Sequence, residues 1–269
     1  MNSSIPCRLC GAESIEQFFA TVLVRHTVRF YQCLRCELLE SEDPWWLEEA
    51  YASPLAVLDT GIMKRNLVVA RTLKPLLFFL CGNQQFFVDF AGGYGILTRL
   101  MRDAGFDFFW SDPHAQNLCA RGFEYVADKG SPAAVTACEC FEHFINPRES
   151  LQQLLSLSKT IFLTTDLLPD PLPAPDQWGY YTFRTGQHIA FYRLKTLNYI
   201  ADKYGLQVYS SGSIHLLTDR TLIPVVAAIL LGERRFKWVQ SLLGVIAKQF
   251  LQSKFASDMD IVQDKYKDM

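Results

Sequence analysis

The feature that most constrains the fold of this chain is a pair of Cys-x-x-Cys motifs near its N-terminus. The first motif holds Cys7 and Cys10, the second holds Cys33 and Cys36, and 22 residues separate them. Each motif can present two thiolates from one tight turn to a single tetrahedral ion. The spacing predicts a structural zinc ion in a small zinc ribbon over residues 1–42, because four thiolates leave no coordination position for water. The alternative is that the four are ordinary cysteines.

Length and composition allow a second, larger folded unit after the ribbon. The chain has 269 residues, of which 49% are hydrophobic and 20% charged, so it can bury a core without disulfides. A formal net charge of -2 provides no basic field for a phosphate backbone, and nucleic acid is not expected as a partner. The N-terminus lacks a secretory signal pattern and every apolar window is too short to cross a bilayer. We therefore expect a cytoplasmic protein without a transmembrane segment.

Strand and helix patterns alternate from residue 86 to residue 217. Short apolar runs predict strands at 86–90, 107–111, 134–138, 160–164, 207–209 and 215–217. Helical spacing and capping signals predict helices at 96–104, 114–121, from 147 and at 194–204. This βαβ alternation predicts an α/β fold with a parallel sheet.

The same patterns predict the domain organisation. A helical cover at 43–84 should precede the α/β core at 85–218, and a C-terminal helical extension should follow at 219–269. Within the cover, residues 62–80 have helical spacing, although Pro75 should kink or restart the helix. The extension mixes basic and apolar residues. Its helix either packs on the core, docks a partner or a second subunit, or lies on a membrane surface.

A glycine-rich turn follows the first strand of the predicted core. The sequence from Asp89 to Gly95 reads Asp-Phe-Ala-Gly-Gly-Tyr-Gly and leads into the helix at 96–104, a context in which the backbone can approach a ligand. The turn lacks both the Gly-Lys-Ser/Thr ending of a phosphate-binding loop and the Gly-x-Gly-x-x-Gly spacing of a dinucleotide site. It resembles the first motif of the class I S-adenosylmethionine-dependent methyltransferases.

This resemblance implies a Rossmann-like, doubly wound fold with a mostly parallel sheet of seven strands, and S-adenosylmethionine as cofactor. Asp89 takes the acidic position of the motif, and Gly93 and Gly95 take its second and third glycines. Ala91 stands where glycine is more usual, and Gly92 beside it restores flexibility. These five residues are the cofactor contacts that the first motif implies.

Two further strand ends fit the same family. Asp112 follows the second strand, where relatives carry an acidic residue that binds the ribose hydroxyls; read alone, it is a helix cap. The stretch Glu139-Cys140-Phe141-Glu142-His143 resembles the Glu-Val-Leu-Glu-His stretch of the bacterial small-molecule branch. By this resemblance Glu139 lies beneath the cofactor, while Glu142 and His143 approach the mouth of the sheet. Read alone, Glu142 and His143 begin a salt-linked helix.

The resemblance covers residues 5–218. Residues 47–51 and 59–66 are similar to the helical cover between a zinc knuckle and the methyltransferase core in bacterial relatives, which implies cofactor contacts from Tyr51 and Arg65. Residues 178–191 are similar to the segment before the last large helix.

Methyl transfer needs a nucleophile held behind the methyl group and a base where its proton is still present. His188 is the preferred base and His143 the second candidate, because imidazole titrates near neutral pH. Glu142 completes the predicted catalytic set. A lone histidine is otherwise more often structural.

Together these residues predict an S-adenosylmethionine-dependent methyltransferase that O-methylates a small molecule, with a sugar or glycan as the favoured acceptor. One alternative is C-methylation of a nucleotide-linked keto sugar, although such relatives carry a longer C-terminal part. Another is a noncatalytic binding protein that retains the methyltransferase fold.

The cysteine spacing predicts about one zinc ion per chain. Elemental analysis of the freshly purified protein should find close to one equivalent, because a structural site holds its ion through the folded state. Less than about half an equivalent of zinc would contradict the four-cysteine site.

Overall fold

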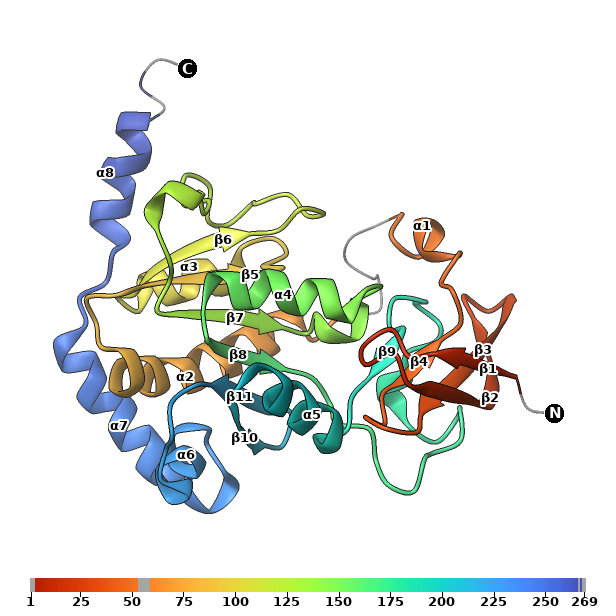
Figure 1. The fold of residues 1–269 in the computed structure, drawn as a ribbon. Helices are drawn as coiled ribbons and strands as arrows, with labels where there is room; N and C mark the ends of the chain where they lie inside the picture. The colour runs from red at the N-terminus through yellow and green to blue at the C-terminus, as the bar shows by residue number, and fades with distance from the viewer. Residues whose placement is uncertain (1–2, 53–58, 266, 268–269) are drawn as a thin grey trace.

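The computed structural model describes residues 3–52, 59–265 and 267, and it contains two β-sheets that lie side by side (Figure 1). The larger sheet has six strands in the order β10-β11-β8-β7-β5-β6. Its strands are β5 (Phe86–Phe90), β6 (Asp107–Ser111), β7 (Ala134–Cys138), β8 (Thr160–Thr164), β10 (Gln207–Ser211) and β11 (Ile214–Thr218). Neighbouring strands from β8 to β6 run parallel, whereas β11 runs antiparallel to both β8 and β10.

Helices cover both faces of the larger sheet. Successive side chains of a strand point to opposite faces, so apolar neighbours in one strand are buried on both. Val88 and Val135 share one buried cluster with side chains of α4 (Pro147–Leu157) and α5 (Leu194–Tyr204). The adjacent Phe87 shares the cluster on the opposite face with α2 (Ile62–Cys81) and α3 (Ile96–Asp103). The predicted Rossmann-like α/β fold is therefore confirmed.

The sheet has six strands where the resemblance implied seven. Beyond β6 the chain makes an isolated parallel bridge between Trp110 and Glu124 and then turns into η1 (Ala127–Lys129). The segment beside β6 is thus too short to form a full seventh strand.

The helix predicted at 114–121 is absent, and this prediction was wrong. Asp112 Oδ1 accepts hydrogen bonds from the backbone N–H groups of His114 and Ala115, at 2.8 and 2.9 Å. The N–H groups of Leu118 and Cys119 both donate to a single carbonyl, that of Tyr94. These bonds hold the segment against the glycine turn and compete with helical hydrogen bonding.

Pro75 does not restart the helix of the cover, because α2 is one element of 20 residues. The proline is buried beside Leu73, Leu76 and Leu77, which belong to the cluster under the sheet. Apolar packing on this face offsets the hydrogen bond that proline cannot donate.

The smaller sheet is antiparallel, and its last strand comes from a segment after β8, about 150 residues or more after the other four in the chain. Its strands in sheet order are β1 (Ser4–Pro6), β2 (Glu13–Val22), β3 (His26–Cys33), β4 (Leu39–Ser41) and β9 (Ala190–Phe191). Phe30 and Trp46, which precedes α1 (Leu47–Ala50), share a buried cluster with Tyr181 and Phe191. Two further short helices, η2 (Phe141–His143) and η3 (Gly179–Tyr181), lie between β7 and β9 in the chain. The domain boundaries at residues 42, 84 and 218 stay predictions. The smaller sheet crosses the first two, because β4 pairs with β9.

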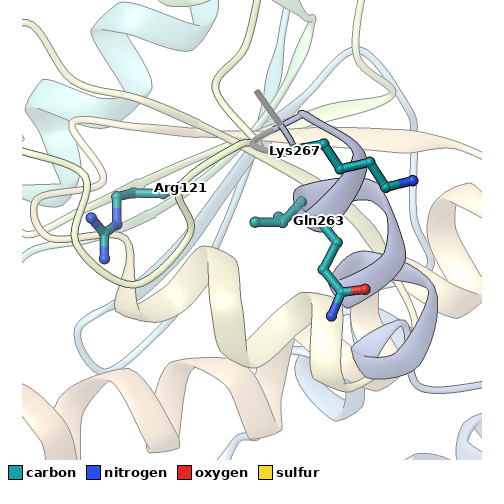
Figure 2. A pocket seen from close by; sticks show the side chains of 4 residues that line it. Arg121, Gln263 and Lys267 are labelled. Carbon is teal, nitrogen blue, oxygen red and sulfur yellow. The ribbon is translucent and has the colours of Figure 1, made fainter. Parts of the chain in front are cut away.

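The C-terminal residues form α6 (Pro224–Leu230), η4 (Arg234–Phe236), α7 (Lys237–Phe250) and α8 (Phe255–Lys265). Leu230 and Leu243 join the cluster beneath α2, so α6 and α7 pack on the core. An open hollow of about 640 Å³ lies beside α8 (Figure 2) and contains none of the predicted site residues; it is lined by Arg121, Val262, Gln263 and Lys267. No helix in the described ranges is both long and apolar enough to cross a membrane.

Helix α8 is anchored by a buried ion pair. The carboxylate of Asp258 accepts two hydrogen bonds from Arg102, at 2.7 and 2.8 Å, and one from Arg99 at 2.7 Å. Although burial opposes it, these hydrogen bonds lower the pKa of Asp258. The side chains of Asp258 and Arg102 are each only 3% exposed, so each charge depends on the other.

We expect Asp258→Asn to lower the free energy of unfolding by about 3 kcal/mol, because Arg102 would remain buried without its main counter-charge. Urea denaturation measures this change. Asp260→Asn, in the exposed part of the same helix, is the matched control and should change stability by less than about 0.5 kcal/mol. Equal stabilities for the two variants would show that α8 does not depend on the ion pair.

Candidate active site and metal centre

The turn after β5 has left-handed backbone angles at three positions. Ala91, Gly93 and Gly95 have φ of 53°, 53° and 81°. This region costs an L-residue about 1–2 kcal/mol, which is the physical reason that glycine suits the position of Ala91. Ala91 therefore holds strained backbone at the carboxyl end of a parallel strand, where α/β folds bind ligands.

The glycines of the turn also permit close packing. A Cβ on Gly92 would lie 2.9 Å from Asp89 Oδ2 and 2.9 Å from Trp110 Cδ1. A Cβ on Gly95 would lie 2.6 Å from Asn117 Oδ1. Residues 91–94 stay only partly buried, so their backbone can meet a ligand.

Asp89 lies beneath this turn and is 2% exposed. Thr136 Oγ1 donates a hydrogen bond to its Oδ1 at 2.6 Å, and Thr98 Oγ1 donates one to its Oδ2 at 3.2 Å. Burial raises the pKa of Asp89 to about 6, although both hydrogen bonds oppose this rise. The carboxyl group thus supports the turn from below, and any effect of Asp89 on a cofactor would pass through the turn.

Asp112 joins the end of β6 to the same turn. Its Oδ2 accepts a hydrogen bond from the N–H of Gly93 at 2.9 Å, and its Oδ1 accepts the two from His114 and Ala115. Because a carboxylate has about four acceptor positions, roughly one remains for a hydroxyl group. The helix-cap alternative does not apply, since no helix follows Asp112.

Glu139 and Arg65 lie at the next strand end. Glu139 follows β7 with a left-handed φ of 49°, and Thr164 Oγ1 donates to its Oε1 at 2.7 Å. Burial and the nearby Glu142 carboxylate raise the pKa of Glu139, and the charge of Arg65 opposes this rise. Arg65 itself forms a two-point ion pair with Asp59, at 2.8 and 2.5 Å.

Glu142, His143 and His188 form a compact polar cluster. Each offers one ligand atom, and these atoms lie within 4.8 Å of one another. The first two residues belong to η2, while His188 lies just before β9. The N–H of Ile189 donates to the carbonyl of Glu142 at 2.9 Å, which ties the two segments together.

Backbone carbonyls orient both imidazole rings of the cluster. Nδ1 of His188 lies 2.8 Å from the carbonyl oxygen of Tyr180, and Nδ1 of His143 lies 3.0 Å from that of Gln187. Because a carbonyl oxygen can only accept, we assign the proton of each ring to Nδ1 and a lone pair to each Nε2. Burial and the neighbouring His143 lower the pKa of His188 to about 3, so this ring is neutral at physiological pH.

The carboxyl group of Glu142 is fully buried and only half satisfied. The hydroxyl of Tyr180 donates to its Oε1 at 2.5 Å. Its Oε2 has no hydrogen-bond partner among the described residues. The hydroxyl of Tyr51 lies 2.9 Å from Nδ1 of His143, so Tyr51 meets this cluster. No sequence pattern assigned a role to Tyr180, and only its place in the segment before His188 marks it.

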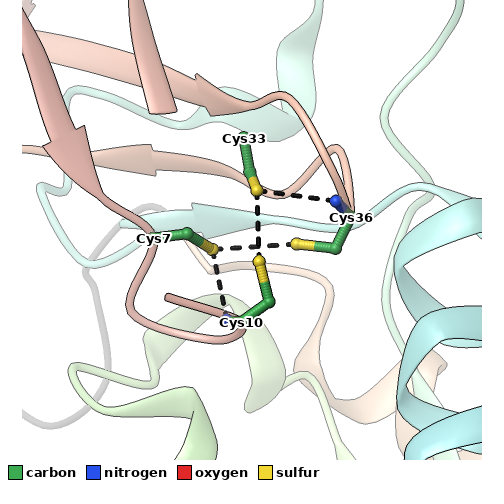
Figure 3. Close-up of side chains that lie close together, drawn as sticks. All are labelled: Cys7, Cys10, Cys33 and Cys36. Atoms are coloured by element: carbon green, nitrogen blue, oxygen red, sulfur yellow. Dashed lines mark hydrogen bonds between the residues drawn. The ribbon is translucent and has the colours of Figure 1, made fainter. Parts of the chain in front are cut away.

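The four predicted cysteine ligands converge, as Figure 3 shows. The Sγ atoms of Cys7 and Cys36 are 3.7 Å apart and those of Cys10 and Cys33 are 3.3 Å apart, with all four thiols free. Zinc–sulfur bonds of about 2.3 Å in a tetrahedron place sulfurs about 3.8 Å apart, so the donor set and its size fit one zinc ion. Backbone N–H groups within 3.5 Å of three of these sulfurs would stabilise thiolates.

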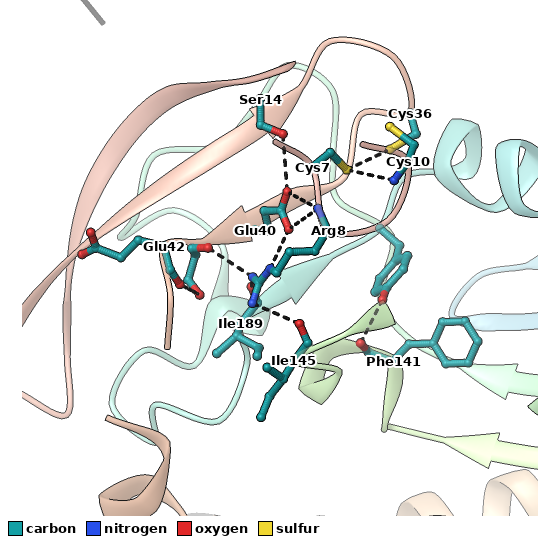
Figure 4. Close-up of polar contacts among 12 residues, drawn as sticks. Cys7, Arg8, Cys10, Ser14, Cys36, Glu40, Glu42, Phe141, Ile145 and Ile189 are labelled. Atoms are coloured by element: carbon teal, nitrogen blue, oxygen red, sulfur yellow. Dashed lines mark hydrogen bonds and ion pairs between the residues drawn. The ribbon is translucent and has the colours of Figure 1, made fainter. Parts of the chain in front are cut away.

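Arg8, inside the first cysteine motif, connects this centre to the core (Figure 4). Its Nε donates to the fully buried carboxylate of Glu40 at 2.7 Å. Its Nη1 reaches the carbonyl oxygen of Ile145 at 3.3 Å, and its Nη2 reaches that of Ile189 at 3.5 Å. This pair was not predicted, because nothing in the sequence spacing of Arg8 and Glu40 marks them as partners.

A known protein family matches the part of the chain that forms most of the larger sheet. The family described as "Methyltransferase domain" matches residues 64–211, which is more than half of the 269-residue chain. A comparison with curated proteins found no match.

Several solved structures match part of this chain at low sequence identity. An O-methyltransferase family 2 protein from Planctomyces limnophilus in complex with apigenin shares 13% identity over 64% of each chain, with a TM-score of 0.39. An O-methyltransferase family protein from Burkholderia thailandensis shares 16% identity over 65% of this chain and 67% of that one, with a TM-score of 0.40. Magnesium protoporphyrin IX methyltransferase from Synechocystis with bound SAH shares 14% sequence identity over 65% of this chain and 91% of that one, with a TM-score of 0.37. This chain thus spans less than two thirds of the Planctomyces protein.

Gly95→Ala should destabilise the protein by about 2–4 kcal/mol, because it adds both left-handed strain and a clash with Asn117. Gly212→Ala is the matched control, since Gly212 has φ 61° and no atom within 4 Å of an added Cβ. The control should cost about 1 kcal/mol, from strain alone. Chemical denaturation measures both values, and equal losses would mean that the turn does not need its contact with Asn117.

Proposed function

Because the chain belongs to the methyltransferase domain family, we propose that it transfers a methyl group from S-adenosylmethionine to a small-molecule acceptor. The observation that carries this proposal is the hydrogen bond from the N–H of Gly93 to Asp112 Oδ2, which joins a glycine turn to an acidic strand end. Both residues lie inside the family match at 64–211.

The proposed cofactor site uses the carboxyl ends of three neighbouring parallel strands, β5, β6 and β7. When bound, S-adenosylmethionine supplies a methyl group activated by a sulfonium charge. The backbone of residues 91–95 would hold the cofactor, with Gly92, Gly93 and Gly95 allowing close approach. The remaining acceptor position of Asp112 would bind a ribose hydroxyl.

The cofactor would lie among acidic groups. Glu139, from the end of β7, would approach it from below, and Tyr51 and Arg65 would close the site from the N-terminal side. The carboxyl groups of Asp112, Glu139 and Glu142 give this region a negative character, which suits a sulfonium cation.

The acceptor would meet the cluster of Glu142, His143 and His188. Its two imidazole lone pairs and its unpaired carboxyl oxygen suit a hydroxyl group, so we propose O-methylation of a sugar-containing or other hydroxylated small molecule. The cluster would position the acceptor oxygen behind the methyl group, where alignment supplies much of the rate. The base role given to His188, with His143 as second candidate, stays a prediction.

The four cysteines complete the proposal with a structural zinc ion. Their thiolates would fill its coordination sphere, so the ion would stabilise the smaller sheet without touching a substrate. Docking of a partner by the C-terminal helices also stays a prediction.

We expect the protein to bind S-adenosylhomocysteine in calorimetry, and Asp112→Ala to weaken this binding at least about tenfold, because a hydrogen bond to a charged group contributes about 1.5–3 kcal/mol. Asp128→Ala, which removes an exposed carboxylate from η1, is the control and should leave the affinity unchanged. The proposal would be contradicted by a wild-type protein that does not bind, or by full affinity in Asp112→Ala.

A further inference from the structure

We propose that Glu142, His143 and His188 bind a divalent transition-metal ion that in turn holds the acceptor, a second metal site distinct from the four-cysteine centre. The geometry that leads to this is the compact cluster described above, in which one carboxyl oxygen and two ring nitrogens lie within 4.8 Å of one another. The acceptor role of the ion rests on the proposed function, with the ion in place of the two imidazoles as the group that meets the acceptor oxygen; the metal site itself does not rest on it.

One oxygen of the Glu142 carboxyl group is unsatisfied. Glu142 is 0% exposed, and its Oε2 has no hydrogen-bond partner among the residues that the structure describes. No ion pair is found for Glu142 within this part of the chain either. A buried carboxylate without a counter-charge is unfavourable, so it requires either protonation or a cation. A metal ion at Oε2 would supply that cation.

Both imidazole rings are oriented through Nδ1. Each donates its Nδ1 proton to a backbone carbonyl, that of Tyr180 for His188 and that of Gln187 for His143, and the Tyr51 hydroxyl also lies 2.9 Å from Nδ1 of His143. In the described ranges, the hydrogen bonds of both rings involve Nδ1 alone, so each Nε2 lone pair is available. Metal-binding histidines almost always have this arrangement, in which the second nitrogen donates to a carbonyl or carboxylate and fixes the ring.

Tyr180 supports two of the three proposed ligands. It donates its hydroxyl proton to Glu142 Oε1 at 2.5 Å, while its carbonyl accepts from His188. Such outer groups, which orient the ligands of a metal ion, are typical of metal sites.

The surrounding charge also suits a cation. The charge of Glu142 helps to raise the pKa of Glu139, so the two carboxyl groups lie close enough to interact. Arg65, a cation that also acts on Glu139, is already paired with Asp59 through two contacts. Two neighbouring carboxyl groups would favour a bound cation.

The ligand set indicates the class of metal. Two imidazoles and one carboxylate favour zinc, iron, cobalt or manganese over calcium and magnesium, and three protein ligands leave coordination positions open. An acceptor hydroxyl at an open position would lose its proton to water more readily. The acceptor oxygen could then form a bond to the methyl carbon of S-adenosylmethionine. The carbon–sulfur bond would break, and the electron pair of that bond would remain on sulfur.

The test measures metal binding separately from activity. Full-length protein that retains its cysteine-bound zinc is equilibrated with Co²⁺, and zinc and cobalt are counted by elemental analysis while the visible spectrum is recorded. We expect one further metal ion per chain, with cobalt absorption that lacks thiolate charge-transfer bands. Glu142→Gln and His188→Gln should each weaken cobalt binding at least about a hundredfold and leave the zinc in place.

Two more variants keep the test decisive. Tyr180→Phe retains all three ligands and should weaken cobalt binding about tenfold to a hundredfold, which covers the case in which a ligand variant fails to fold. His114→Gln, an exposed histidine outside the cluster, should bind cobalt as the wild type does. Wild-type protein that binds no cobalt, or cluster variants that bind it normally, would overturn the metal site.

Calorimetry with S-adenosylhomocysteine separates this inference from the proposed function. A protein that binds S-adenosylhomocysteine but does not bind cobalt would overturn the metal site and leave the methyltransferase proposal standing. A protein that binds cobalt but does not bind S-adenosylhomocysteine would support the metal site and contradict the methyltransferase proposal.

Discussion

The buried ion pair between Arg8 and Glu40 determines how the two sheets of this protein meet. Glu40 has no exposed surface, and burial raises its pKa to about 7 although Arg8 opposes this rise. Such a pair persists only where further hydrogen bonds satisfy both partners. Here the guanidinium of Arg8 also reaches the carbonyls of Ile145 and Ile189. Ile145 follows His143 by two residues and Ile189 directly follows His188, so the position of the polar cluster depends on a charge held inside the first cysteine motif.

The candidate site otherwise depends on strained backbone at the ends of parallel strands. Ala91 and Glu139 both adopt left-handed angles without being glycine, directly after β5 and β7. Hydrogen bonds support the chain beside each position: Thr136 bonds Asp89, two residues before Ala91, and Thr164 bonds both the backbone and the side chain of Glu139. The sheet therefore supplies the free energy that keeps these residues in place, and their side chains and backbone stay oriented toward one edge.

Local patterns predicted the features that are local in sequence. The cysteine pairs, the glycine turn and the strands of the larger sheet depend on neighbouring residues, and the structure contains all of them. The helix expected at 114–121 failed because one side chain, Asp112, bonds the backbone that the helix would use.

Features that join distant segments could not be predicted from the sequence. Strand β9 has two residues, too few for any periodicity, and its partner β4 lies some 150 positions earlier. The pairing of Tyr180 with Glu142 depends likewise on how two loops meet. Family resemblance placed Glu142, His143 and His188 near the mouth of the sheet, but the Nδ1 contacts that orient the rings come from backbone carbonyls, which no residue pattern encodes.

The late position of β9 in the chain has a consequence for biosynthesis. Domains generally fold from the N-terminus as the ribosome releases them. The cysteines and strands β1 to β4 are synthesised before the larger sheet, yet their own sheet closes only when Ala190 and Phe191 follow. Until then the edge of β4 and the apolar side chains of Phe30 and Trp46 lack their partners from the core. The ribbon is therefore synthesised before the core but completed only after β8, and binding of the proposed zinc ion would stabilise it during that interval.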